Sequence, residues 1–216
     1  MKKLSAVIFD LDGTLLDSLN AWTEIDHHFF GRRGMTMPAD YTTSIAHMTL
    51  ELAADYTIER FALTDSKEAV IEEWRVLALE EYALRVPLKP GAAEYIAALR
   101  TRGVRTAIAT ACREELCMAA LRRHGLAHAF DCITYSEYTG IRKGTPEIYL
   151  HTAEALGVPP EECLVFEDLP DGVAGAAAAG MQTVGMLNDN RRHEWARLCA
   201  LAGRVIHDFT EELPLL

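Results

Sequence analysis

Short, continuous apolar runs that alternate with helical patterns constrain the fold of this chain more than any other feature. The runs occupy residues 6–9, 106–110, 133–135, 163–166, 183–186 and 204–206. Runs without polar alternation are typical of strands buried on both faces, and such strands form parallel sheets between layers of helices. The sequence therefore predicts an α/β fold, with a three-layer core around a parallel sheet.

The interval between the first two runs is far longer than a crossover needs. A crossover between parallel strands takes about a dozen residues or slightly more, whereas residues 10–105 lie between these runs. Within residues 16–86 the apolar side chains recur at helical spacings. We therefore expect an inserted, all-helical domain of residues 16–86 and a core domain of residues 1–15 and 87–216.

Charge and cysteine content limit the partners. The chain carries 21 Lys and Arg residues against 32 Asp and Glu residues, a formal net charge of −11, so it should repel nucleic acids and anionic membranes. Its five cysteines form no C-x-x-C pair, which argues against a disulfide framework or a structural zinc and favours a reducing compartment. The apolar run near the N-terminus is too short for a signal peptide or a membrane span. We expect a cytoplasmic monomer or homodimer that binds a small molecule.

Charged and hydroxyl side chains follow four of the apolar runs. In chain order these side chains are Asp10, Asp12, Thr110, Lys143, Glu167 and Asp168. Ligands of open α/β sheets bind beyond the carboxyl ends of the strands, where such residues meet. We therefore expect these six residues to share one site.

The carboxylates among them indicate a metal. Asp10 and Asp12 are two residues apart, so in an extended chain both point the same way, and Gly13 lets the backbone turn after them. Together with Glu167 and Asp168 they would repel one another strongly in a partly desolvated pocket. A hard divalent cation resolves this conflict, and oxygen ligands without His or Cys favour Mg²⁺.

The remaining residues suit an anion. The Thr110 hydroxyl and the amides of Ala111 and Cys112 lie where a strand gives way to a helix, and could hold a phosphate at the positive end of the helix dipole. Lys143 adds a point charge. Each residue taken alone also has a structural interpretation, since Asp and Gly are turn residues, Thr110 suits a helix N-cap and Lys143 a solvated surface. Their coincidence at strand ends favours function.

Four motifs cover almost the whole chain in order: VIFDLDGTLLDS, AIATACRE, IRKGTPEIY and VFEDLPDGVAGAAAAGM. With them the sequence resembles the haloacid-dehalogenase-like superfamily of phosphohydrolases, in the branch related to β-phosphoglucomutase. The resemblance implies a Rossmann-like core and a helical cap in the inserted segment.

The resemblance also implies roles for individual residues. Asp10 matches the nucleophile that forms an aspartyl-phosphate, and Asp12 matches the general acid and base. Thr110 and Lys143 match the phosphate binders. The Mg²⁺ ligands implied are Glu167 and Asp168 together with Asp10 and the carbonyl of Asp12. The first two motifs further place three residues at the substrate: Gly13, Thr14 and Ala111.

Departures from related members favour a phosphatase over the other activities of the superfamily. Dehalogenase members lack the second aspartate, which is present here as Asp12. Mutase members resemble one another in a cap histidine and a cap arginine, where this sequence has Trp22 and Thr49, although Arg32, Arg33 or Arg60 could substitute for the arginine. A phosphonate hydrolase needs a cap lysine, for which only Lys67 is available.

A non-catalytic binding module on the same fold stays open as a different class of function. The catalytic positions all carry the expected residues, which favours an enzyme. Four residues of the inserted segment are candidates for selecting the leaving group: Trp22, His47, Met48 and Thr49. Because this set is mostly uncharged, it suits a sugar phosphate or a similar metabolite.

Overall fold

The computed structural model describes residues 3–45 and 48–213. The chain divides into two compact units, of which the first comprises Met1–Leu19 and Pro87–Leu216 and the second Asn20–Val86. The first is called the sheet unit below, and the second the helical unit. No helix of the described residues is both long and apolar enough to cross a membrane.

The sheet unit is built around six strands that occupy the six predicted runs. They are β1 (Ala6–Phe9), β2 (Arg105–Thr110), β3 (Cys132–Tyr135), β4 (Cys163–Glu167), β5 (Gln182–Met186) and β6 (Arg204–Ile206). Its helices are α5 (Ala92–Thr101), α6 (Glu114–Arg123), α7 (Ser136–Thr139), α8 (Pro146–Leu156), α9 (Pro170–Ala178) and α10 (Trp195–Leu201). Short 3-10 helices lie at Pro160–Glu162, Asp189–Glu194 and Phe209–Glu211.

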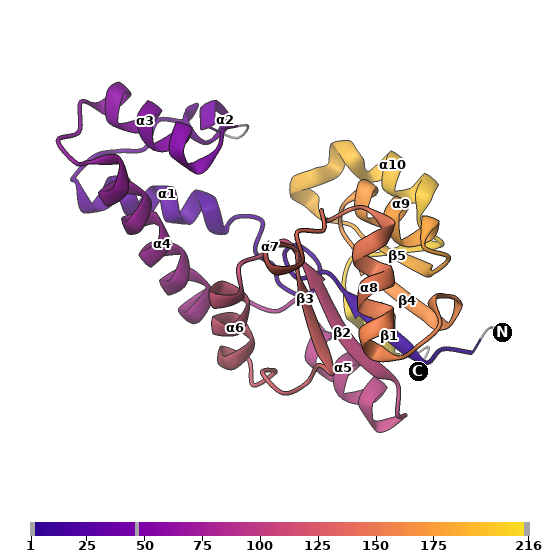
Figure 1. Ribbon diagram of the computed structural model, residues 1–216. Coiled ribbons are helices and arrows are strands. Elements are labelled where there is room, and N and C mark those ends of the chain that lie inside the picture. Colours follow the sequence, from indigo (N-terminus) through magenta and orange to yellow (C-terminus); the bar gives the residue numbers. More distant parts are fainter. Residues whose placement is uncertain (1–2, 46–47, 214–216) are drawn as a thin grey trace. The chain divides into compact units, whose positions relative to one another are not determined.

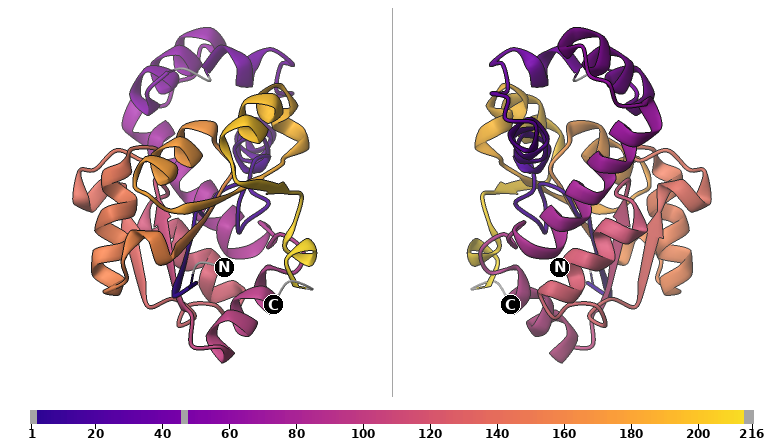
Figure 2. Two further views of the ribbon diagram at one scale, coloured as in Figure 1. Left: turned by 90° about the vertical axis from the view of Figure 1, so that its right-hand side faces the viewer. Right: turned by 90° about the vertical axis from the view of Figure 1, so that its left-hand side faces the viewer.

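The strands form one parallel sheet in the order β3-β2-β1-β4-β5-β6. Figure 1 shows α8, α9 and α10 on one face of this sheet and α5 and α6 on the other, and Figure 2 shows β6, in yellow, at the sheet edge. The predicted α/β fold with helices on both faces of a parallel sheet is thereby confirmed.

Burial on both faces explains why the strands are continuously apolar. In β1, Ala6 and Ile8 belong to the core cluster that includes residues of α8 and α9. Phe9 lies on the opposite face, where its ring meets those of Tyr95 at 6.3 Å and Phe209 at 5.8 Å. Neither face of β1 reaches water, so no position in the strand has reason to be polar.

The helical unit contains α1 (Ala21–Arg32), α2 (Tyr41–Ile45), α3 (Leu50–Phe61) and α4 (Lys67–Leu84). Helix α4 packs against α1 and α3. Aromatic side chains dominate this core: Phe30 meets Tyr41 at 4.8 Å, and Phe29 meets Trp74 at 5.5 Å. A second hydrophobic core of this kind lets the insertion fold as a unit of its own.

The boundary between the units lies a few residues later than the sequence suggests. The amide of Asp17 donates to the carbonyl of Pro87 at 2.9 Å, and the amide of Lys89 donates to the carbonyl of Leu15 at 2.8 Å. Leu16 and Leu88 form an antiparallel bridge. These backbone contacts join residues 15–17 to residues 87–89 within the sheet unit, and the helical unit begins at Asn20.

One acidic side chain is buried in the helical unit. Asp26 of α1 is 5% exposed. Burial raises the pKa of this carboxyl to about 7, an effect that the neighbouring Thr42 hydroxyl partly offsets. Since the folded pKa lies above the usual value of 3.8, the folded state binds the proton more tightly than the unfolded state does. The resulting stabilisation is complete below pH 3.8 and is lost as the pH rises towards 7.

We therefore expect Asp26→Asn to stabilise the protein at neutral pH. A shift of about three pKa units corresponds to about 4 kcal/mol, and because the buried amide of Asn is itself polar, we expect a gain on the order of 1–2 kcal/mol. Urea unfolding at pH 5 and pH 8 measures this effect. The advantage of the variant over the native chain should grow between these two pH values, and an advantage independent of pH would contradict the assignment.

Candidate active site

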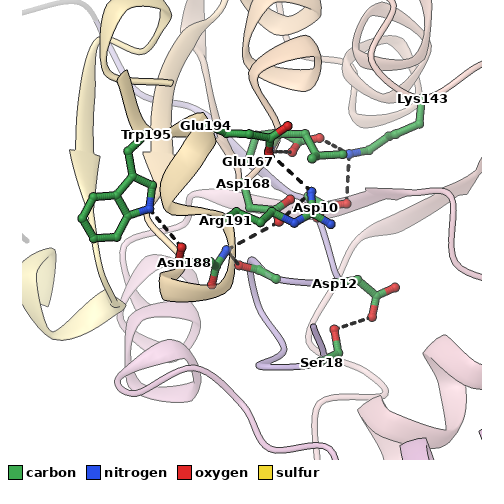
Figure 3. Close-up of polar contacts among 12 residues, drawn as sticks. Asp10, Asp12, Ser18, Lys143, Glu167, Asp168, Asn188, Arg191, Glu194 and Trp195 are labelled. Atoms are coloured by element: carbon green, nitrogen blue, oxygen red, sulfur yellow. Dashed lines mark hydrogen bonds and ion pairs between the residues drawn. The ribbon is translucent and has the colours of Figure 1, made fainter. Parts of the chain in front are cut away.

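Three carboxylates meet at the carboxyl ends of β1 and β4. Asp10 directly follows β1, and its amide donates to the carbonyl of Phe166 in β4 at 2.9 Å. Glu167 ends β4 and Asp168 follows it. All three residues are buried, and each places one carboxylate oxygen within 4.8 Å of the others (Figure 3). The sheet topology brings them together because β1 and β4 are neighbours.

Lys143 lies among these carboxylates. Its ammonium donates to Oδ1 of Asp10 at 2.9 Å and makes a short contact to Oε1 of Glu167. The Tyr149 hydroxyl donates to the same Glu167 oxygen at 3.0 Å, and the amide of Leu169 donates to the other at 3.0 Å. Burial opposes the charge of Lys143, but Asp10 and Glu167 outweigh it, and the pKa of the ammonium is raised well above its usual value.

The donor set suits a hard cation. Burial raises the pKa of Asp10, although Lys143 lowers it, and burial together with the charges of Asp10 and Glu167 raises the pKa of Asp168. One ammonium therefore does not neutralise the group. Among the described residues this cluster contains oxygen donors only, without His or Cys, and such ligands are preferred by Mg²⁺.

Small residues in α9 allow the Lys143 loop to come close. A Cβ atom on Gly175 would lie 2.6 Å from the carbonyl oxygen of Gly144, directly after Lys143. No real side chain tolerates this distance to a backbone atom. Gly175 is therefore needed to place the lysine at the carboxylates.

Asp12 lies apart from the three carboxylates. Its Oδ1 accepts a hydrogen bond from the Ser18 hydroxyl at 2.7 Å, and Figure 3 shows its carboxylate turned towards Ser18. The expectation that Asp10 and Asp12 point the same way assumed an extended chain, but β1 ends at Phe9. Gly13 follows with a positive φ of 81°. A Cβ atom there would come within 2.4 Å of Asp168 Oδ2, so the turn requires glycine.

The residues expected at the phosphate lie at the end of β2 and in the first loop. Thr110 is buried, and its hydroxyl accepts from the amide of Cys112 at 2.9 Å, so this amide is engaged locally. Ala111, between them, is exposed. Thr14 is fully buried, and its hydroxyl has no hydrogen-bond partner among the described residues.

Sequence reasoning missed a polar network after β5. Asn188 is buried; its Nδ2 donates to the carbonyl of Gly13 at 2.9 Å, and its Oδ1 accepts from Lys89 Nζ at 2.6 Å. Arg191 places Nη1 3.7 Å from Oδ2 of Asp168. The other site residues were selected because each follows an apolar run. Applied to the fifth run, the same rule would have found Asn188.

The helical unit holds the residues expected to select a substrate. Trp22 and Met48 line a cavity of about 380 Å³ within this unit. Thr49 has a local role, since its hydroxyl accepts from the amide of Leu52 at 3.4 Å and caps α3. His47 lies outside the described residues.

Comparison with known proteins adds a family and named relatives. The model of the family described as haloacid dehalogenase-like hydrolase matches residues 4–180. A probable pseudouridine-5'-phosphatase of Drosophila melanogaster is 30% identical, over 88% of this chain and 84% of the relative. The fructose-1-phosphate phosphatase YqaB of Escherichia coli is 30% identical over 85% and 96%. The solved structure of a "putative beta-phosphoglucomutase" from Thermotoga maritima has a TM-score of 0.83 and 28% identity, covering 94% of each chain.

We expect Mg²⁺ to stabilise the protein through the three carboxylates. A ligand that binds only the folded state stabilises it by about 2.7 kcal/mol at a hundredfold excess over its Kd, which calorimetry detects as a rise in Tm. Asp168→Asn removes one of the expected ligands and should abolish the rise.

Asp171→Asn provides the matched control. Asp171 is an aspartate of α9 whose exposed side chain pairs with Arg197. This variant should respond to Mg²⁺ as the native chain does. A full response in Asp168→Asn would show that the metal binds elsewhere.

Proposed function

Because the chain belongs to the haloacid dehalogenase-like hydrolase family and is a phosphatase of that family, we propose that it hydrolyses a small phosphomonoester with Mg²⁺ through an aspartyl-phosphate on Asp10. The observation that supports this chemistry best is the buried group of Asp10, Glu167 and Asp168 with Lys143 among them. Such a group combines a nucleophile, metal ligands and a fixed positive charge within one small volume.

The nucleophile is held in place before the substrate arrives. Lys143 binds one oxygen of Asp10, which leaves the other oxygen to attack phosphorus in line and to form the acyl phosphate. When bound, Mg²⁺ supplies positive charge that offsets the carboxylates and the phosphate. The Thr110 hydroxyl and Lys143 hold the phosphate oxygens. Formation of the aspartyl-phosphate replaces one difficult displacement by two easier ones.

Asp12 supplies the proton. Its carboxyl protonates the leaving oxygen and then takes a proton from the water that hydrolyses the aspartyl-phosphate. The hydrogen bond from Ser18, which lies in the sheet unit shortly before the helical unit begins, orients this side chain. The loops after β1 and β2 complete the site, with Gly13 and Thr14 of the first and Ala111 of the second next to the phosphate.

A phosphatase is favoured over a phosphomutase by the arginines of the helical unit. A mutase must hold a second phosphate while the intermediate reorients. Three arginines could take this role, and each pairs with carboxylates of the same unit: Arg32 with Glu73 and Glu80, Arg33 with Asp65 and Glu73, and Arg60 with Asp40.

A phosphonate hydrolase is disfavoured by the pairing of Lys67. This lysine pairs with Asp55 at 2.7 Å, which raises the pKa of its ammonium and disfavours the neutral amine that a Schiff base requires.

The substrate class follows from the inserted segment and from the relatives. Trp22, Met48, Thr49 and His47 would select the leaving group, and their mostly uncharged character suits a sugar phosphate or a similar metabolite. The relatives named above include phosphatases of phosphorylated small molecules. We place the protein in the cytoplasm, as a monomer or homodimer without nucleic-acid or membrane partners. The inserted helical unit stands where members of this family carry their cap.

The central prediction concerns Asp10. Asp10→Asn should lower Mg²⁺-dependent hydrolysis of p-nitrophenyl phosphate by roughly 10³-fold or more, because the amide cannot form the acyl phosphate. Circular dichroism should show an unchanged fold. Asp171→Asn, again the matched control, should keep its activity, and a nucleophile other than Asp10 would be indicated if Asp10→Asn kept more than a trace.

A panel of phosphorylated metabolites distinguishes the phosphatase from its alternatives. Phosphate release from one or a few esters supports the proposed function. β-Glucose 1-phosphate is included with glucose 6-phosphate as the measured product. Isomerised sugar phosphate without released phosphate would establish a mutase, and no turnover of any compound would leave a binding module.

A further inference from the structure

The segment after β5 places an arginine beside one of the three carboxylates, and the proposed chemistry does not use it. Arg191 Nη1 lies 3.7 Å from Oδ2 of Asp168 and 3.8 Å from Oε2 of Glu194 (Figure 3). Both distances are too long for a hydrogen bond, so the guanidinium acts on these carboxylates through its charge. Arg191 lies beyond residues 4–180, which the family model matches. The family match therefore assigns it no role.

The backbone fixes the position from which this side chain extends. The amide of Arg191 donates to the carbonyl of Asn188 at 2.9 Å, and the Trp195 indole donates to the same carbonyl at 2.9 Å. Asn188 is itself buried. Arg191 departs from helical geometry, with φ −122° and ψ 31°, inside the 3-10 segment Asp189–Glu194. The place of the guanidinium is thus a consequence of how this segment folds on the sheet unit.

The neighbouring arginine is held differently. The side chain of Arg192 is 69% exposed and donates twice to Oδ1 of Asp189, at 2.9 and 2.7 Å. The side chain of Arg191 is 32% exposed. In the described part of the chain, only Arg191 of these two has an ion pair with Asp168. The two residues therefore carry the same charge, but only the first faces an expected metal ligand.

A positive charge in this place opposes the binding of a cation. Mg²⁺ lies about 2 Å from the oxygens that bind it, so an ion on Asp168 would be close to the Arg191 guanidinium. The two positive charges repel each other, and solvent weakens this repulsion because Arg191 is partly exposed. Glu194 counteracts the effect, since its Oε2 is buried, accepts no hydrogen bond among the described residues and is ion-paired with Arg191.

We propose that Arg191 limits the affinity of the three-carboxylate group for Mg²⁺, and that Glu194 moderates this limit. Arg191 acts through Asp168 and needs no contact with the substrate. The proposal rests on the cation site of the proposed function, but not on its catalytic steps. Binding of Mg²⁺ alone therefore tests it.

Calorimetric titration of the full chain with MgCl₂ measures the affinity without catalysis. Arg191→Gln removes the charge and keeps a polar side chain, and should bind Mg²⁺ about threefold to tenfold more tightly. Arg191→Lys keeps the charge and should stay within about twofold of the native chain. Arg192→Gln is the matched control, because it removes the same charge one residue away, and it should bind Mg²⁺ as the native chain does.

Glu194→Gln should change the affinity in the opposite direction. Without this carboxylate the charge of Arg191 is less compensated, so Mg²⁺ should bind several-fold more weakly. A general loosening of the site would weaken binding in both Arg191→Gln and Glu194→Gln. Salt gives a second readout, since repulsion between charges is screened. The tightening in Arg191→Gln should therefore shrink between about 0.05 M and about 0.5 M NaCl.

Tighter binding in Arg191→Gln together with weaker binding in Glu194→Gln supports the proposal. Unchanged or weaker binding in Arg191→Gln, or an equal tightening in Arg192→Gln, overturns it. If circular dichroism shows that Arg191→Gln does not fold, Glu194→Gln decides the question, and native affinity in that variant overturns the proposal.

The outcomes also separate this proposal from the proposed function. If the native chain hydrolyses p-nitrophenyl phosphate with Mg²⁺ but the variants bind the ion alike, only the role of Arg191 is wrong. If the affinities shift as expected but p-nitrophenyl phosphate is not turned over, the role of Arg191 stands and the catalytic function fails. A native chain that binds no Mg²⁺ would overturn both.

Discussion

The mutual repulsion of three buried carboxylates determines which groups surround the carboxyl ends of β1 and β4 in the sheet unit. Asp10, Glu167 and Asp168 are brought together because β1 and β4 are neighbours in a parallel sheet. Water cannot screen them there, so the surrounding protein must supply positive charge and hydrogen-bond donors. Lys143, the Tyr149 hydroxyl and the amide of Leu169 do so. These groups do not balance all of the negative charge. The remaining charge attracts a divalent cation, and the cation in turn binds a phosphate.

Close packing elsewhere follows from the need to bring these groups together. The loop with Lys143 reaches the carboxylates only because Gly175 leaves space beside Gly144. The turn after Asp12 passes Asp168 only because Gly13 has no side chain. Asn188 then fixes that turn from the other side through the Gly13 carbonyl. Glycines and one amide thus determine where the charges lie, although none of them is charged.

The helical unit contains the same kind of unfavourable burial on a smaller scale. Asp26 and the Trp74 indole are desolvated without full compensation, at a cost that an aliphatic pair in the same place would avoid. Groups of this kind are typical of functional sites, where stability is lower than the fold would allow.

The amino-acid sequence by itself determined the parallel α/β sheet, because strands buried on both faces need continuous apolar residues. It also determined that Asp10, Glu167 and Asp168 lie at strand ends. Local pattern also indicated an all-helical insertion. Tertiary structure alone decided that Asp12 turns to Ser18, that residues 15–17 pair with 87–89, and that Asp26 and Trp74 line the same cavity. Periodicity reports whether a residue is buried. Which distant residue it is buried against depends on how whole elements pack, and no local pattern encodes that.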